Sequence, residues 1–203
     1  MKTLLTSLLI ICFWMSGVNF IQAQQLPAAG DRTFEIGITP LGNNPVNFDQ
    51  FRLRSFQNSD TAYRLRVDIY YESERTGEHR RDSRFDIELA PGIEWHALQQ
   101  DPLSVYYGAE VGLRYRTSRQ QVSEDITNIN TNPNGFFGVD VNALVGFDLH
   151  FLQYLYTGAE VGYGIRFTNY LDQEVNDQDV EVDARDFYLR RIAYPRIRLG
   201  MKF

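Results

Sequence analysis

The sequence predicts an all-β protein: an eight-stranded, antiparallel, up-and-down transmembrane β-barrel, preceded by a cleaved signal peptide. Three observations predict this fold. Eight segments alternate apolar and polar residues, which is the pattern of strands with two unlike faces. The connections between them alternate in length, and glycines gather on the charged face. We expect residues 1–23 to be the signal peptide, 24–30 a short N-terminal linker and 31–203 one outer-membrane β-barrel domain.

The N-terminal segment has the order of a secretory signal. Lys2 precedes an apolar core from Leu4 to Trp14, and residues 21–23 form a cleavage site. A membrane anchor is the weaker alternative, because this core is shorter than the roughly 20 residues that a spanning helix needs. The single cysteine, Cys12, lies in this segment without the small residues expected around a lipid attachment site. The mature chain should therefore have no disulfide and no thiol chemistry.

The predicted strands alternate residue by residue, and the third is the clearest. In residues 62–72, Tyr63, Leu65 and Val67 point one way, while Arg64 and Arg66 point the other. The fifth and seventh strands share the sequence Gly-Ala-Glu-Val-Gly, so Glu110 and Glu160 should lie at similar heights. Most segments reach the roughly 9–11 residues of a tilted transmembrane strand. In chain order the predicted strands are residues 32–39, 50–56, 62–72, 83–97, 103–116, 136–151, 154–168 and 186–203.

The connections indicate which end of the barrel faces outward. Short periplasmic turns are expected at residues 57–61, 98–102 and 152–153. Longer outward loops are expected at residues 40–49, 73–82, 117–135 and 169–185. Short turns on one side and long loops on the other are typical of outer-membrane barrels. The third loop is rich in Asn, Thr and Gln, and we expect it to be mobile.

Alternation alone does not separate a membrane barrel from a soluble lipocalin-like barrel with an apolar interior. Size does, because an eight-stranded barrel is just wide enough inside for side chains to fill it. The apolar face is bulky throughout, as in Phe137, Val141 and Phe147, which favours an apolar exterior. Glycines relieve crowding on the opposite face. They are Gly108, Gly112, Gly138, Gly146, Gly158, Gly162, Gly164 and Gly200. Outer aromatics are expected at Tyr71, Phe85, Tyr115, Phe137 and Phe167, and periplasmic ones at Tyr63, Trp95 and Phe203.

The basic residues are almost all arginine, since Lys2 and Lys202 are the only lysines. Arginine suits crowded ion pairs, because its planar fork grips carboxylates bidentately. The expected inward cations lie on strands two, three and eight: Arg52, Arg54, Arg64, Arg66, Arg196 and Arg198. The expected inward anions lie on strands four to seven: Asp86, Glu88, Glu94, Glu110, Asp140, Asp148 and Glu160. Because buried charges must pair, we expect a polar plug, with a narrow or gated ion path as the alternative.

The last strand, residues 195–203, ends in Phe203. Together with residues 106–112 and 155–160, it resembles the small bacterial outer-membrane β-barrel domain family of OmpA/OmpX type over residues 31–203. The resemblance implies an outer-membrane location and recognition of the terminal aromatic by the barrel assembly machinery. Nothing follows the last strand, so the resemblance does not extend to the peptidoglycan-anchoring part of full-length OmpA-like proteins.

No catalytic, cofactor or metal site is predicted. The histidines His79, His96 and His150 should not meet, since the first lies in an outward loop and the others on separated strands. No zinc-protease, nucleophile-elbow or phosphate-loop motif is present. Some outer-membrane barrels modify lipids with a Ser/His/acid set, and Ser104 should lie on the inward face near the periplasmic end, as His96 and His150 do. A lipid-modifying enzyme therefore remains an alternative.

The outward loops carry opposite charges. Residues 73–84 are basic, with Arg75, Arg80, Arg81 and Arg84, while residues 169–183 are acidic. The basic loop would contact lipopolysaccharide phosphates or the acidic loop. The run Asp177, Asp179, Glu181, Asp183 is a solvated hairpin or, alternatively, a divalent-cation site without the glycine and glutamate of an EF-hand loop.

The predicted function is that of a non-enzymatic outer-membrane barrel that acts in envelope structure or in interactions through its loops and outer wall. Its expected partners are outer-membrane lipid, lipopolysaccharide and other envelope proteins, either as a free-standing monomer or as a subunit of a larger complex. The net charge of −6 argues against nucleic acid.

Overall fold

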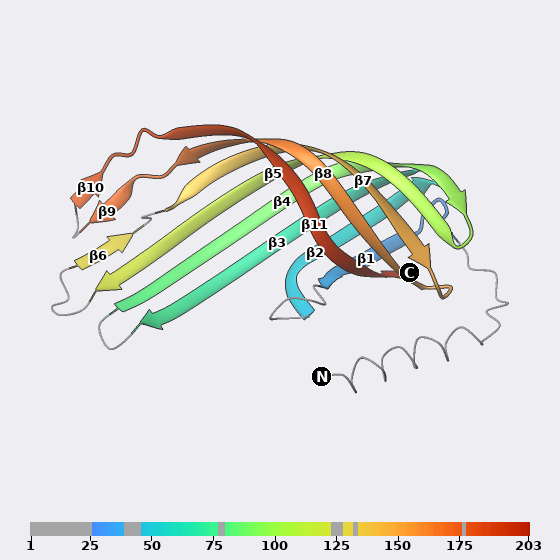
Figure 1. Ribbon diagram of the computed structural model, residues 1–203, viewed down its shortest axis with the longest axis horizontal. Helices are drawn as coiled ribbons and strands as arrows, with labels where there is room; N and C mark the ends of the chain where they lie inside the picture. Colours follow the sequence, from blue (N-terminus) through green and yellow to red (C-terminus); the bar gives the residue numbers. More distant parts are fainter. Residues whose placement is uncertain (1–25, 39–45, 77–79, 123–127, 132–133, 176–177) are drawn as a thin grey trace, which may run out of the picture.

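The structure is a computed structural model that describes residues 26–38, 46–76, 80–122, 128–131, 134–175 and 178–203 (Figure 1). The expected signal peptide, the end of the predicted first strand at Thr39, and His79 lie outside these residues. Gly30 lies in a turn with φ 90°, and its backbone N–H donates to the Phe56 carbonyl at 2.9 Å, just before the first strand.

Eight antiparallel strands close into a ring. Each strand pairs with its neighbours around the ring, and the first strand pairs with the last, where Thr33 faces Lys202 and Ile38 faces Ile197. The predicted eight-stranded up-and-down barrel is therefore confirmed. In ring order the strands are β1 (Arg32–Ile38), β2 (Val46–Asn58), β3 (Thr61–Thr76), β4 (Arg80–Gln100), β5 (Leu103–Val122), β7 (Phe136–His150), β8 (Leu155–Tyr170) and β11 (Arg185–Lys202).

One end of the barrel has only tight connections. β2 joins β3 through Ser59 and Asp60, and β4 joins β5 through Asp101 and Pro102. The chain end closes the same rim, where the Phe203 N–H donates to the Arg32 carbonyl at 2.9 Å. By the loop-length pattern of outer-membrane barrels, this is the periplasmic end.

The two faces of the wall carry opposite chemistry. Along β7 the side chains alternate between buried and exposed: Val141 is 57% exposed, while its neighbours Asp140 and Asn142 are both buried. The predicted apolar exterior is thus confirmed. The expected aromatics Tyr71, Tyr115, Phe137 and Phe167 face outward at the extracellular end, and Tyr63, Trp95 and Phe203 do so at the periplasmic end. Among the described residues, no helix is long and apolar enough to cross a membrane.

Glycines on the inner face make room for large side chains. A Cβ at Gly200 would fall on the ring of Tyr156, and one at Gly146 would fall on the ring of Tyr106. Both tyrosines are completely buried, at 0% and 1% exposure. The predicted role of glycine in relieving crowding inside a narrow barrel is confirmed at these positions.

Three strands continue beyond the membrane as an extracellular extension. β3, β4 and β5 have 16, 21 and 20 residues, well above the roughly 9–11 of a membrane span. The upper end of β5 leaves β7 and pairs with β6 (Asn128–Thr131), followed by β9 (Gln173–Val175) and β10 (Gln178–Val180). In Figure 1 these strands project together, away from the chain's C-terminus.

The structure corrects all four predicted outward loops, beginning with loop 40–49, of which residues 46–49 belong to β2. Residues 73–82 are mostly paired strand, with Ser73 facing Ser83 and Arg75 facing Arg81. Residues 117–122 continue β5, and part of the expected mobile loop forms β6. Above the membrane neither face of a strand needs apolar residues, so alternation does not mark these strands. The predicted loop 169–185 also contains short strands, β9 and β10.

Candidate functional site

The lower half of the lumen is filled by a continuous ion-pair network. Arg54 contacts Glu35 at 2.7 Å, Glu94 at 3.1 Å and Asp148 at 2.8 Å, so one guanidinium joins three strands. Arg198 contacts the same Glu35 at 2.8 Å and Asp148 at 3.0 Å. All five side chains are almost completely buried. Each charge thus has at least two opposite partners, which is what a buried ion pair requires to offset its desolvation.

A second set of contacts lies above the first. Arg64 bridges Glu94, Glu110 and Glu160 at 2.9, 3.1 and 2.8 Å. Arg66 contacts Glu110 at 2.7 Å and Glu88 at 2.6 Å. The two glutamates of the repeated Gly-Ala-Glu-Val-Gly sequence therefore meet at one arginine, as their predicted equal height requires.

The predicted division of charges between two sides of the barrel is partly wrong. Glu35, on β1, was not predicted as a lumen residue, yet it lies among Arg52, Arg54 and Arg198. On the predicted acidic side, arginines that were not predicted as lumen residues neutralise the carboxylates: Arg114 and Arg116 pair with Asp86, and Arg166 with Asp140. The side chain of Arg196 lies outside the described residues.

Near the periplasmic rim, the structure brings together two residues that the sequence placed only on the same face. His96 Nδ1 lies 2.8 Å from Ser104 Oγ, and His96 Nε2 lies 3.6 Å from Glu94 Oε2. The pair is packed between rings, with the His96 ring 5.2 Å from Phe56 and 5.3 Å from Tyr106. Ser104 is only 1% exposed, so an acyl substrate has no approach to its hydroxyl.

The other histidine inside the barrel, His150, stands apart from this pair. Its ring packs against that of Tyr156 at a tilt, with centroids 5.0 Å apart, and it lies on β7 with β5 between it and His96. In the part of the chain that the structure describes, no group of three or more His, Cys, Asp or Glu is arranged to hold a metal ion. In the acidic run 177–183, Asp179 lies on β10 and faces Glu174 on β9, as expected of a hairpin, while Asp177 lies outside the described residues, so the cation site stays a prediction.

At the extracellular end the plug gives way to an open cavity of about 290 Å³, the mouth cavity. Among the described residues, no carboxylate lines it. Asp86, buried on the inner face of β4, accepts hydrogen bonds from Arg114 Nε at 2.7 Å and from Arg116 Nε at 2.9 Å. At the rim, a hydrogen bond to Asp186 raises the pKa of the Tyr170 hydroxyl above its ordinary value, so this group stays protonated. The lining is Arg84, Arg114, Arg116, Ser118, Asn134, Phe136, Arg166, Thr168, Tyr170 and Tyr188.

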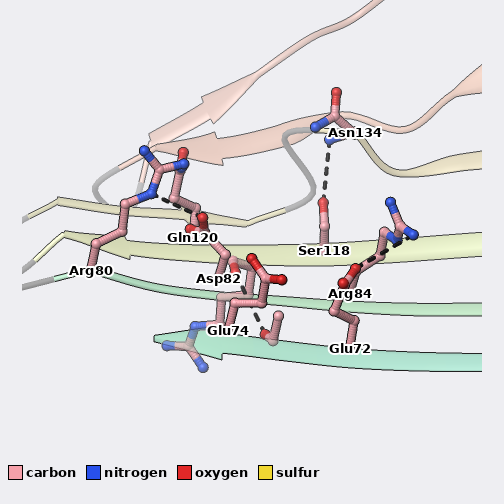
Figure 2. Close-up of a pocket in the computed structure, with 10 residues that line it drawn as sticks. Glu72, Glu74, Arg80, Asp82, Arg84, Ser118, Gln120 and Asn134 are labelled. Atoms are coloured by element: carbon pink, nitrogen blue, oxygen red, sulfur yellow. Dashed lines mark hydrogen bonds and ion pairs between the residues drawn. The ribbon is translucent and has the colours of Figure 1, made fainter. Parts of the chain in front are cut away.

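A second cavity, of about 270 Å³, continues outward along the inner face of the extension (Figure 2). It shares Arg84, Ser118 and Asn134 with the mouth cavity. Unlike the mouth, it carries both signs of charge: Arg80 pairs with Asp82 at 2.9 Å, and Arg84 lies 3.5 Å from Glu72. Figure 2 shows Ser118 opposite Asn134, whose backbone N–H donates to the serine hydroxyl at 3.3 Å.

The outward face of the extension differs from its inward face. Directly above the aromatic pair Tyr71 and Phe85, the register places Ser73 opposite Ser83 and then Arg75 opposite Arg81. Arg119 on β5 faces Ser83 on the same side. These three exposed arginines form what we call the outer basic face, and no acidic residue shares that face of β3, β4 and β5 between the girdle and the strand ends. β6 lies between β5, the last strand of this face, and the acidic hairpin of β9 and β10.

Comparisons with known proteins add a likeness of fold at low identity. No protein-family model matches the chain, and no curated protein matches it. The crystal structure of Ail, the attachment invasion locus protein of Yersinia pestis, aligns with 9% identity and a TM-score of 0.49. The alignment covers 86% of this chain and 99% of that one. The fold and the faces of the barrel rest on the structure described above.

Proposed function

We propose that the protein is a non-enzymatic barrel of the bacterial outer membrane that does not conduct, and that it acts through its extracellular extension and outer wall. The observation that carries this proposal is the contrast within one set of strands. Inside the membrane, the charged side chains on the inner faces of these strands are buried in ion pairs with one another. Above the membrane, the same strands carry charged side chains that remain open to their surroundings. Surfaces that a rigid scaffold holds in place are where binding usually resides.

Lipopolysaccharide is the first partner that we propose. Arg75 and Arg81 form the second outward-facing residue pair above the aromatic pair Tyr71 and Phe85, and we propose that phosphate groups of the outer leaflet lie at this depth. Arg75 and Arg81 face each other directly, and like charges opposite one another destabilise a strand pair unless an anion lies between them. Bound phosphates would relieve this repulsion, since arginine pairs with phosphate bidentately.

Two neighbouring residues test the lipid contact. Arg80 and Arg81 are both exposed at the same strand end, but Arg80 faces inward and Arg81 outward. We expect lipopolysaccharide to stabilise the wild-type barrel over neutral phospholipid, and Arg81→Gln to remove about 1 kcal/mol of that stabilisation. Arg80→Gln is the matched control and should keep it. Urea unfolding in vesicles with and without lipopolysaccharide measures both, and equal losses would contradict the proposal.

Planar-bilayer recordings test the closed lumen. We expect no stable conductance steps, because every described arginine of the lower lumen bridges carboxylates on other strands. Stable steps that disappear in lumen variants would favour the narrow pore instead. The third candidate, a lipid-modifying enzyme, depends on Ser104.

The proposal also covers assembly and partners. We propose that the barrel assembly machinery recognises the C-terminal strand through Phe203, which is 62% exposed on the outer wall. A pull-down from outer membrane in mild detergent separates a free-standing protein from a subunit of a complex. A stoichiometric envelope protein that is recovered with the barrel would identify a subunit.

A further inference from the structure

The mouth cavity is distinctive because hydrogen-bond donors line it. Arg84, Arg114, Arg116 and Arg166 reach it from β4, β5 and β8, and hydroxyl groups from Ser118, Thr168 and two tyrosines complete the wall. The acidic groups beside these side chains are not among the lining residues, and each has a partner: Asp86 binds Arg114 and Arg116, and Asp140 binds Arg166. Glu72 lies 3.5 Å from Arg84, and Asp186 accepts a hydrogen bond from Tyr170 at 2.7 Å. A space walled by guanidinium and hydroxyl groups has the chemistry of an anion site.

Two of the arginines are held with donors to spare. Arg114 and Arg116 both bind the single carboxylate of Asp86, each through Nε and Nη2. Two cations thus share one anion, and among the described residues no acceptor binds the Nη1 group of either arginine. The Phe136 ring packs against both guanidinium groups, with its centroid 5.5 Å from the guanidinium carbon of Arg114 and 4.7 Å from that of Arg116. The side chains are therefore oriented before any ligand arrives.

A buried hydroxyl points to the same place. Thr168 lines the cavity and is only 3% exposed, yet its Oγ1 has no hydrogen-bond partner among the described residues. Buried polar groups in native proteins nearly always have partners, and one without a partner is costly. A ligand oxygen in the cavity would satisfy this hydroxyl.

We propose that the mouth cavity binds a small oxyanion of the phosphate or sulfate class, held by Arg114, Arg116 and Thr168. Tetrahedral oxyanions offer several acceptor oxygens, which match converging guanidinium groups better than chloride does. The volume of about 290 Å³ admits a free anion or one carried by a single sugar ring, and it excludes a larger molecule from entering whole. This inference is independent of the lipid contact proposed above, since the outer basic face lies on the other side of the sheet.

Calorimetric titration of the purified full barrel in a neutral detergent tests the proposal, with inorganic phosphate, sulfate and chloride as probes. We expect saturable binding of phosphate and sulfate and none of chloride. Arg116→Gln should weaken phosphate binding by about tenfold or more, which corresponds to about 1.4 kcal/mol. Arg80→Gln removes the same charge from the neighbouring cavity and should leave the affinity within about twofold. Equal losses in both variants would reduce the effect to general surface charge and overturn the proposal.

Thr168→Val is a second variant that separates lost binding from misfolding, because valine keeps the shape of threonine and removes only its hydroxyl. If Thr168 is only an orphaned hydroxyl, the isosteric valine will not change phosphate binding. We expect instead a weaker affinity in a barrel that keeps its folded mobility in unheated gel electrophoresis. Glucose 6-phosphate then separates the sources: competition with phosphate indicates a phosphate carried on a saccharide, and its failure to compete indicates a free ion. An absence of saturable binding by phosphate and sulfate would overturn the proposal.

Discussion

The lower lumen and the mouth of this barrel are built from the same strands and the same kinds of side chain, yet they behave differently. Near the periplasmic rim, Arg54 and Glu35 have completely buried side chains, each with several partners. At the mouth, Arg84 is 40% exposed and contacts one carboxylate at 3.5 Å. Both regions contain arginine and carboxylate side chains, so the difference in their burial and pairing comes from the geometry of the wall.

The geometry changes where β5 changes its partner. Up to Arg116, which faces Phe136, β5 pairs with β7 and the ring is closed. From Arg119, which faces Thr131, it pairs with β6 and the wall opens. In the lower part of the closed ring, Arg54 and Arg198 meet carboxylates of several strands, so they are paired and cut off from water. At the top of the ring, Arg114 and Arg116 pair with Asp86, but their side chains are still 17% and 22% exposed. In the open part no opposite wall exists, so charges remain available to ligands.

The comparison would fail most clearly if lumen charges could be removed without cost. Arg198→Leu leaves Glu35 and Asp148 each short of a buried partner, and we expect it to lower the free energy of unfolding by about 3–5 kcal/mol. Arg84→Leu at the mouth should cost about 1 kcal/mol at most, because its ion pair is exposed. Urea unfolding in bilayers measures both, and similar losses would show that the two regions do not differ.

The outer wall allows a similar comparison between a position in the membrane and one above the outward aromatic residues. Val141→Arg places a charge on the lipid-facing surface near mid-height, where the expected cost is about 2–4 kcal/mol. Ser73→Arg, outward but above Tyr71 and Phe85, should cost about 0–1 kcal/mol. The same unfolding assay applies. If Val141→Arg left the free energy of unfolding unchanged, the apolar face would not contact lipid.

Substitutions of inward glycines should show the same difference between the lower lumen and the mouth, with smaller changes in the free energy of unfolding. Gly200→Ala puts a methyl group on the Tyr156 ring, and overpacking of this kind costs about 1–3 kcal/mol. At Gly138, near the mouth, an added Cβ would meet its nearest atoms, on Phe136 and Phe167, at 3.5 Å. Gly138→Ala should therefore be neutral or stabilising by up to about 1 kcal/mol. If Gly138→Ala and Gly200→Ala destabilised the barrel equally, side chains at the mouth would be packed as tightly as in the lower lumen, which contradicts the prediction.

The closed ring was predictable from the sequence because lipid imposes a strict pattern. Apolar-out, charged-in alternation marked every membrane-spanning segment, and the glycines identified the inner face. The extension was not predictable in this way. Residues such as Ser73, Glu74 and Arg75 are polar on both faces, so nothing in their pattern separates a paired strand from a loop.

The lumen network was predictable in kind and less so in its partners. Glu35 sits in a short strand with few charged neighbours in sequence, but alternation with Phe34 and Ile36 was a signal that it faces inward. Arg114, Arg116 and Arg166 were missed, although their alternation with Leu113, Tyr115 and Phe167 was a signal that they face inward. Whether such a face is plugged or forms a cavity depends on where β5 leaves β7, a long-range choice that local sequence does not encode.

The smallest expected effect concerns the Ser104–His96 pair, and it also tests the enzyme alternative. If the pair is structural, Ser104→Ala removes one buried hydrogen bond and lowers the free energy of unfolding by about 0.5–1.5 kcal/mol. The lipid A of cells that produce the variant should then match wild type by mass spectrometry, because a hydroxyl that is 1% exposed cannot attack a lipid ester. Ser83→Ala on the extension is the control, with an expected change within about 0.5 kcal/mol. Lipid A that loses an acyl chain with wild-type protein but not with Ser104→Ala would make this pair catalytic, and the sealed lower lumen would then have to open to admit lipid.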